Sequence, residues 1–168
     1  MNQYNSEAKD TTLGGDDSTG WSFSDAEVHS NQLPESLKVE TALAKELGVE
    51  PVQVGMPEFD QMVQNAEQNG EKLKWVVTQD GELWFIPARV DDNEIYHSVI
   101  TNGGDVIAAG ETEIMSSWES GFKYIALDLT NHSGHYKPSP ASLDQIAKLV
   151  FEQNGIYVPP DSMHPHIH

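Results

Sequence analysis

An Asp-Gly pair at positions 80 and 81 constrains the fold of this chain more than any other local pattern. It separates two short segments rich in apolar residues, 73–77 and 83–86, and apolar and polar residues alternate in the first of them. An Asp-Gly pair between two such segments is typical of a tight turn that joins antiparallel strands. The sequence therefore predicts a β-hairpin, around which any helices must pack.

Further strands are predicted on the C-terminal side of this hairpin. Turn residues at 91–93 and 102–105 bound two short segments, 94–100 and 106–111, and each is expected to be a strand. Residues 122–129 alternate between apolar and polar and predict a last, half-buried strand. The pattern as a whole predicts an antiparallel meander of about five strands.

Three segments show helical spacing of apolar residues. Two precede the sheet, one running from Pro34 to a stop at Gly48 and one from Pro57 to a stop at Gly70. The third starts at Ser139 and Pro140 and ends at Gly155. The residues expected to face the sheet are Leu37, Ala42, Leu43 and Leu47, then Phe59, Met62, Val63 and Ala66, and finally Leu143, Ile146, Ala147, Val150 and Phe151. The predicted fold is α+β, with two N-terminal helices, the meander sheet and one C-terminal helix packed on it.

The length of 168 residues fits one globular domain with flanking segments. Residues 1–33 contain few apolar side chains, with Trp21 and Phe23 the most prominent, and are expected to form a flexible acidic leader. Residues 34–160 are expected to form the single domain, and residues 161–168 a histidine-containing tail. The tail histidines alternate, but without a second source of ligands we predict no metal site there. No cysteine is present, which excludes thiol catalysis and disulfides.

The net charge of −18 restricts the possible partners. Residues 1–34 hold six acidic residues and one lysine, a net charge of −5, which leaves −13 for the rest of the chain. Phosphate backbones are bound through Lys and Arg, so DNA is not an expected partner, whereas a basic protein is. The N-terminal residues contain no apolar run, so neither a signal peptide nor a membrane span is predicted.

Residues 131–139 (NHSGHYKPS) carry the densest group of reactive side chains, at a predicted strand-to-helix turn. The candidate catalytic residues here are His132, His135, Tyr136 and Lys137. His97 and Ser98, in a predicted neighbouring strand, could join them. Paired histidines can act as general base and general acid near neutral pH, and Lys137 or Tyr136 can stabilise developing negative charge.

Two alternatives remain open for these residues. His132 and His135 could instead brace the turn and cap the following helix through hydrogen bonds. Glu111 follows the small residues 108–110 (AAG), which indicate the close approach of another backbone or of a ligand. Glu111 is therefore a candidate acid or base. No histidine spacing matches a known metal motif, so neither a metal nor another cofactor is predicted.

Several segments together resemble a known module. They are PVQVGMPEFD (51–60), KWVVT (74–78), HS (97–98) with TNGG (101–104), AAGE (108–111) and NHSGHYKPSPASL (131–143). In order and spacing they resemble a C-terminal module of bacterial polymorphic toxins, including those at the ends of RHS-repeat proteins. The shorter core also looks like the central domain of plant proteins with an IQ calmodulin-binding motif, although no IQ-type helix is visible here. The resemblance spans residues 48–155.

The resemblance implies an effector or toxin domain used in interbacterial competition, secreted by a non-classical route or delivered into a target cell, with a cognate immunity or inhibitor protein as partner. It implies no reaction. Three hypotheses follow: a metal-independent nuclease that cleaves RNA with paired histidines, a protein-modifying toxin similar to ADP-ribosyltransferases that depends on Glu111, and a non-enzymatic acidic module that binds a protein. The nuclease hypothesis requires His97 to lie with His132 or His135 in an open pocket. If the chain is a protein-binding module, these histidines are expected to be buried and hydrogen-bonded to the backbone.

Overall fold

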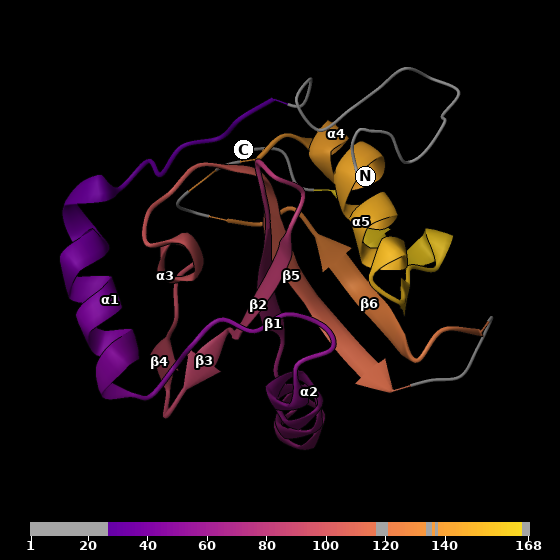
Figure 1. Ribbon diagram of the computed structural model, residues 1–168, viewed down its shortest axis with the longest axis horizontal. Coiled ribbons are helices and arrows are strands. Elements are labelled where there is room, and N and C mark those ends of the chain that lie inside the picture. Colours follow the sequence, from indigo (N-terminus) through magenta and orange to yellow (C-terminus); the bar gives the residue numbers. More distant parts are fainter. Residues whose placement is uncertain (1–26, 117–120, 134–135, 137, 166–168) are drawn as a thin grey trace.

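A six-stranded sheet forms the centre of the structure, a computed structural model that describes residues 27–116, 121–133, 136 and 138–165 (Figure 1). The strand order is β2-β1-β5-β6-β7, and β8 also pairs with β6. The strands are β1 (Leu73–Thr78), β2 (Leu83–Pro87), β5 (Val106–Ser116), β6 (Tyr124–Thr130), β7 (Ile156–Tyr157) and β8 (Met163–His164). The prediction of a domain that mixes helices with a sheet is confirmed.

The predicted hairpin is present at the start of this sheet. β1 and β2 are antiparallel, with Trp75 opposite Phe85, and Gly81 adopts a φ of 85° in the turn between them. A left-handed backbone angle of this kind favours glycine, because it has no Cβ to clash. The alternation of residues 73, 75 and 77 is confirmed, since all three side chains are buried on one face of the sheet.

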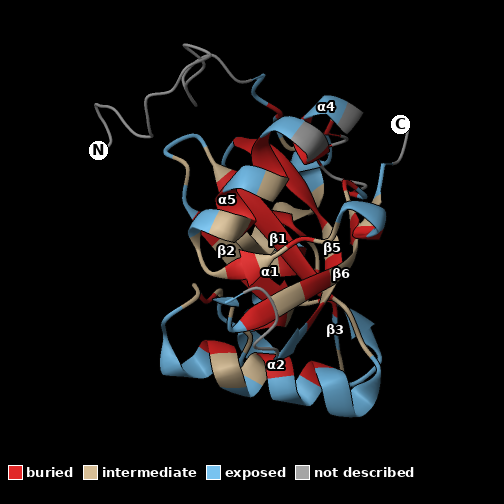
Figure 2. Ribbon diagram, turned by 90° about the vertical axis from the view of Figure 1, so that its right-hand side faces the viewer, coloured by how far each residue is buried: buried red, intermediate tan, exposed pale blue. Residues whose placement is uncertain are grey.

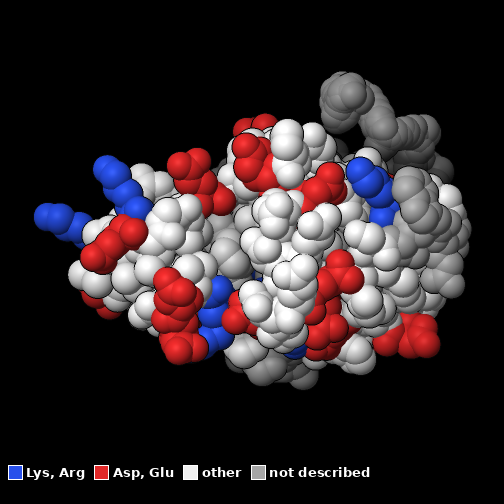
Figure 3. All heavy atoms as spheres, turned by 90° about the horizontal axis from the view of Figure 1, so that it is seen from below, with Lys and Arg blue, Asp and Glu red and all other residues white. Residues whose placement is uncertain are grey.

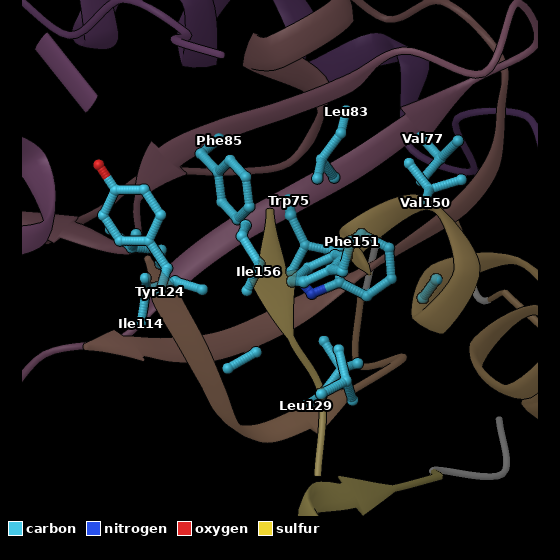
Figure 4. Packing of buried hydrophobic residues seen from close by; sticks show 14 of the residues in the cluster. Trp75, Val77, Leu83, Phe85, Ile114, Tyr124, Leu129, Val150, Phe151 and Ile156 are labelled. Carbon is cyan, nitrogen blue, oxygen red and sulfur yellow. The ribbon is translucent and has the colours of Figure 1, made fainter. Parts of the chain in front are cut away.

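This face carries the main hydrophobic core. It is covered by α2 (Pro57–Asn69) and by the C-terminal helix, which consists of α4 (Pro140–Ser142), the π-helical segment η4 (Leu143–Ala147) and α5 (Lys148–Gln153). Figure 4 shows aromatic side chains meeting there, and the Phe151 ring lies edge-on to Trp75 at 5.2 Å between centroids. The predicted apolar faces of these two helices are confirmed: Figure 2 shows buried residues on their sheet-facing sides.

The opposite face of the sheet is covered by shorter elements. A 3-10 turn, η2 (Pro34–Ser36), leads into α1 (Leu37–Glu46), and α1 packs on α3 (Ser98–Thr101), which lies against β1 and β2. The predicted apolar face of the first helix is partly wrong, because Ala42 is exposed while Glu40 and Ala44 are buried. The helix packs on α3, which lies between α1 and the sheet in Figure 1.

The predicted strand at residues 94–100 is wrong. β3 (Arg89–Val90) and β4 (Asn93–Glu94) form a separate two-stranded sheet, and the chain then enters helix α3. Asp91 and Asp92, both with positive φ, make the tight turn between β3 and β4. A short apolar run such as the one at 95–100 does not distinguish helix from strand by itself, and tertiary contacts decide between them.

The predicted meander is also wrong in its strand order. β5 pairs with β1, so β3 and β4 lie outside the main sheet, and β7 and β8 are parallel to β6. β7 and β8 contain only two residues each, too few for a strand pattern to be recognised in the sequence.

Ordered backbone is also present on both sides of the predicted domain. The backbone groups of His29 exchange hydrogen bonds with those of Val106, upstream of the predicted start at Pro34. In the predicted tail, η5 (Pro160–Ser162) leads into β8. No helix among the described residues has the length and apolar character needed to span a membrane.

Candidate functional site

Three polar residues of the turn after β6 are buried in the structure. Asn131 and Ser133 are buried, and Tyr136 is 1% exposed. The Asn131 side-chain amide donates a hydrogen bond to the Pro138 carbonyl at 2.9 Å, and the Ser133 hydroxyl accepts one from the Tyr136 backbone N–H at 3.3 Å. These bonds fix the chain between β6 and the C-terminal helix, because buried polar groups need partners.

The Tyr136 hydroxyl ties this turn to the loop between α3 and β5. It donates a hydrogen bond to the Gly104 carbonyl at 2.8 Å and lies 3.1 Å from the Thr101 hydroxyl, which donates to the same carbonyl at 3.0 Å. The Tyr136 ring packs with Val76 and Ala109 on the second face of the sheet. Burial raises the pKa of Tyr136, so the phenol stays protonated and serves as a donor.

His97 occupies a closed position. Its side chain is 2% exposed, and its Nε2 lies 2.6 Å from the Gly110 carbonyl oxygen of β5. A carbonyl oxygen can only accept, so this contact requires the hydrogen on Nε2. His97 therefore links the segment before α3 to the centre of the sheet.

The glycine of the AAG run is required by packing. A Cβ placed on Gly110 would lie 1.7 Å from the Thr130 carbonyl oxygen and 2.8 Å from the Trp75 ring. Of the two interpretations of this run, the close approach of another backbone explains Gly110. β5 and β6 thus approach each other closely at Gly110, the residue whose carbonyl His97 contacts.

Ser98 and Glu40 form a buried pair between two helices. The Ser98 hydroxyl donates a hydrogen bond of 2.6 Å to Glu40 Oε1, and both residues are buried. Hydrogen bonds to a charged acceptor are stronger than neutral ones. The pair joins α1 to α3, and Ser98 is thus used as a donor to the first helix of the fold.

Glu111 is half-buried on the second face of the sheet, opposite Lys74 on β1 and Thr130 on β6. Lys74, the polar residue between Leu73 and Trp75 in β1, is itself 3% exposed. Its ammonium contacts Glu94 Oε2 at 2.7 Å and lies 5.1 Å from the centre of the Tyr96 ring. A carboxylate and an aromatic face together compensate for burial of this charge.

His132 lies apart from these buried residues. Its side chain is exposed, and its backbone N–H donates a hydrogen bond to the Thr130 hydroxyl at 3.2 Å. His135 and Lys137 lie outside the described residues. The structure therefore gathers His97, Ser98, Tyr136 and Glu111 around α3 and β5, and it places His132 on the surface at the end of β6.

Four residues of this region were missed by the sequence reasoning: Glu40, Lys74, Thr101 and Asn131. Helical spacing offers a signal for Glu40, because residues 37, 40, 44 and 47 follow the 3.6-residue period more closely than residues 37, 42, 43 and 47 do. The other three offered no such signal, since strands and turns commonly carry polar residues at such positions.

An open groove lies elsewhere on the molecule, along α2. We call it the α2 groove, and its volume is about 640 Å3. It is lined by residues 47–52 after α1, Met56 with one side of α2, Glu71 and Lys72 before β1, and Pro87, Arg89, Val90 and Asp91 from the end of β2 to the turn after β3. None of the five candidate residues that the structure describes lines it. The sequence patterns do not indicate this groove, because it forms only when residues 87–91 fold back onto residues 47–72.

Among the described residues, no three His, Asp or Glu side chains are grouped so as to hold a metal ion. Comparison with protein-family models, with curated proteins and with solved structures finds no match to this chain.

Proposed function

We propose that the chain is an effector-type domain, of the class carried by polymorphic toxins, that acts by binding a basic protein and not through a paired-histidine reaction. The observation that carries this proposal is the closed environment of two candidate catalytic residues, His97 and Tyr136. His97 is directed at a backbone carbonyl, and Tyr136 donates to another. A general base needs an accessible lone pair within reach of a substrate proton, and the contacted nitrogen of His97 has none to offer.

The net charge of −18 supports a basic protein as the target. Surface charge of one sign attracts the opposite charge and speeds association, and it repels polyanions such as RNA. The remaining parts of the proposal come from the resemblance to polymorphic toxins. The chain would be delivered into a target cell or secreted by a non-classical route, would act in competition between bacteria, and would have a cognate immunity or inhibitor protein that protects the producing cell.

Expression of the full chain in a bacterial host tests this mode of action. Wild type, His132→Ala and His135→Ala are compared for growth, soluble yield and cleavage of added RNA. We expect all three to slow growth equally and none to cleave RNA. Loss of the growth effect in a soluble His135→Ala chain, together with loss of RNA cleavage, would replace binding by the nuclease mechanism. A wild-type chain that is harmless without an inhibitor rejects the effector class.

One observation favours a second candidate, transfer of ADP-ribose to a protein. The half-buried side chain of Glu111 lies on the same face of the sheet as Tyr136, and its carboxylate forms no hydrogen bond with described residues. A carboxylate in such a place can act as a base or stabilise positive charge. Labelled NAD incubated with the chain and a bacterial lysate distinguishes the two candidates, since labelled protein with wild type but not with Glu111→Gln supports transfer, and no label with either supports binding.

A further inference from the structure

The α2 groove has the size and lining of a binding site. Its volume of about 640 Å3 lies within the range of about 300–1,000 Å3 found for ligand pockets. Its apolar part includes Val52 and Ala66, which are buried, Met62, which is partly buried, and Met56, which is 39% exposed. An apolar side chain from outside would therefore meet apolar atoms there.

Charge around the groove is predominantly negative. Glu50, Glu58, Glu71 and Asp91 line it, and within the described part of the chain none of the four forms an ion pair. Figure 3, which views the side of the molecule on which α2 lies, shows acidic side chains spread over it. Carboxylates without partners beside an apolar floor attract cations.

The two cations in the lining are already engaged. Lys72 contacts Asp128 Oδ2 at 2.5 Å, and this hydrogen bond raises the pKa of Lys72. Arg89 donates a hydrogen bond to the Asp92 carbonyl at 2.8 Å. Neither compensates the four carboxylates of the groove directly, so the groove favours a positively charged occupant.

We propose that the α2 groove binds a basic segment of a partner protein, in which an apolar side chain enters the groove between flanking Lys or Arg residues. This proposal rests on the function proposed above and assigns the surface that performs it. Charge argues against two other occupants, a second copy of the chain and its own N-terminal segment. Two copies with a net charge of −18 repel each other, and residues 1–26, with five acidic residues and one lysine, are repelled by the carboxylates of the groove.

Fluorescence anisotropy with a labelled peptide of alternating Lys and Leu tests the groove in the full chain. Two control peptides carry Glu in place of Lys, or Gly in place of Leu. We expect the Lys-Leu peptide to bind, and binding to weaken as ionic strength rises because screening removes the charge attraction. Equal binding of the Lys-Gly peptide would show that the apolar floor plays no part and would overturn the proposal.

Matched variants locate the site. Glu58 and Glu67 are both exposed on α2, but only Glu58 lines the groove; Met56 and Met115 are 39% and 40% exposed, and only Met56 lines it. We expect Glu58→Lys and Met56→Gln each to weaken peptide binding about fivefold, as loss of one exposed ion pair or one apolar contact does. Glu67→Lys and Met115→Gln should leave it unchanged.

Two outcomes overturn the assignment. Equal weakening by Glu58→Lys and Glu67→Lys would mean that the peptide follows general surface charge. Sedimentation that shows a dimer of the full chain, lost in Met56→Gln, would give the groove to a second copy. The peptide measurement does not depend on harm to a cell, so its failure is separate from failure of the effector function, which the growth comparison decides.

Discussion

At the turn after β6, Asn131 and Tyr136 are buried and donate hydrogen bonds to backbone carbonyls, whereas in the α2 groove Glu50 and Glu58 are exposed and form no ion pair with described residues. The turn contains the residue types that are typical of catalysis, and the groove contains ordinary carboxylates and methionines. The difference shows that residue type alone does not mark a site, because Asn131 and Tyr136 are buried and hydrogen-bonded within the fold, while the carboxylates of the groove remain accessible.

The largest effect that would sharpen this comparison is expected at Gly110. A Gly110→Ala chain places a methyl group 1.7 Å from the Thr130 carbonyl oxygen, so β5 and β6 must separate. We expect the free energy of unfolding to fall by about 3 kcal/mol, measured by urea denaturation. Gly104→Ala serves as the control, since its nearest contact would be 3.2 Å. Equal stability of the two variants would contradict the packing role of Gly110.

His97 and His132 provide the next test. His97→Ala leaves the buried Gly110 carbonyl without this donor, and we expect it to lower the free energy of unfolding by about 2 kcal/mol. His132→Ala removes an exposed side chain and should change it by less than about 0.5 kcal/mol. Denaturant titration checks both, and His97→Gln, which retains a donor, should recover part of the loss. A large cost at His132 would contradict its surface placement.

Tyr136→Phe should have a smaller effect. Gly104 keeps its hydrogen bond from Thr101, so we expect a loss of about 1 kcal/mol at neutral pH. Tyr157→Phe is the control, because within the described residues the Tyr157 hydroxyl has no hydrogen-bond partner. Thermal unfolding of both variants checks this, and equal melting temperatures would contradict the anchoring role of Tyr136.

The raised pKa of Tyr136 also predicts alkaline destabilisation. In the unfolded chain the phenol loses its proton at its ordinary pKa of 10.0, and in the folded chain only at higher pH. Above pH 10 the unfolded state therefore binds fewer protons than the folded state, so stability falls as pH rises through the folded pKa. Tyr136→Phe should remove this part of the pH dependence, as denaturation at several alkaline pH values would show.

The smallest effect is expected in the groove. Met56→Gln should change the free energy of unfolding by less than about 0.5 kcal/mol, because the Met56 side chain is substantially exposed. Met115→Gln is the matched surface control. Calorimetry of both variants checks this expectation. If Met56→Gln lowered the free energy of unfolding as much as His97→Ala does, the groove would be as much a part of the folded core as the buried turn, which would contradict the comparison.

The parts of the fold that the sequence predicted are those with strong local patterns. The hairpin at Asp80 and Gly81, helix α2 and the face of the C-terminal helix each follow from spacing within a few residues, since turn chemistry and amphipathic periodicity are local. Burial of Lys74 could not be predicted, because it depends on Glu94 and Tyr96 from a separate segment.

The candidate site was predicted only in its residue types. Grouping His97 with the turn rested on a strand that the structure replaces with the start of α3, and the contact with Gly110 depends on the order of strands in the sheet. Tyr136 was chosen as a reactive group, and its surroundings assign it a hydrogen bond to Gly104. Such partners are set by tertiary contacts, which periodicity does not encode.

Parallel pairing of β7 and β8 with β6 has a consequence for the kinetics of folding. Both short strands lie after the C-terminal helix, so the chain must complete that helix and return before Tyr124 and Leu129 gain their partners Ile156 and Met163. Until then β6 is an unpaired edge, the kind of surface on which chains associate. Closing these long loops costs chain entropy before the strand pairs form, so the pairing of β7 and β8 with β6 is expected to be late and slow. The folding chain is expected to be most prone to aggregate before this step.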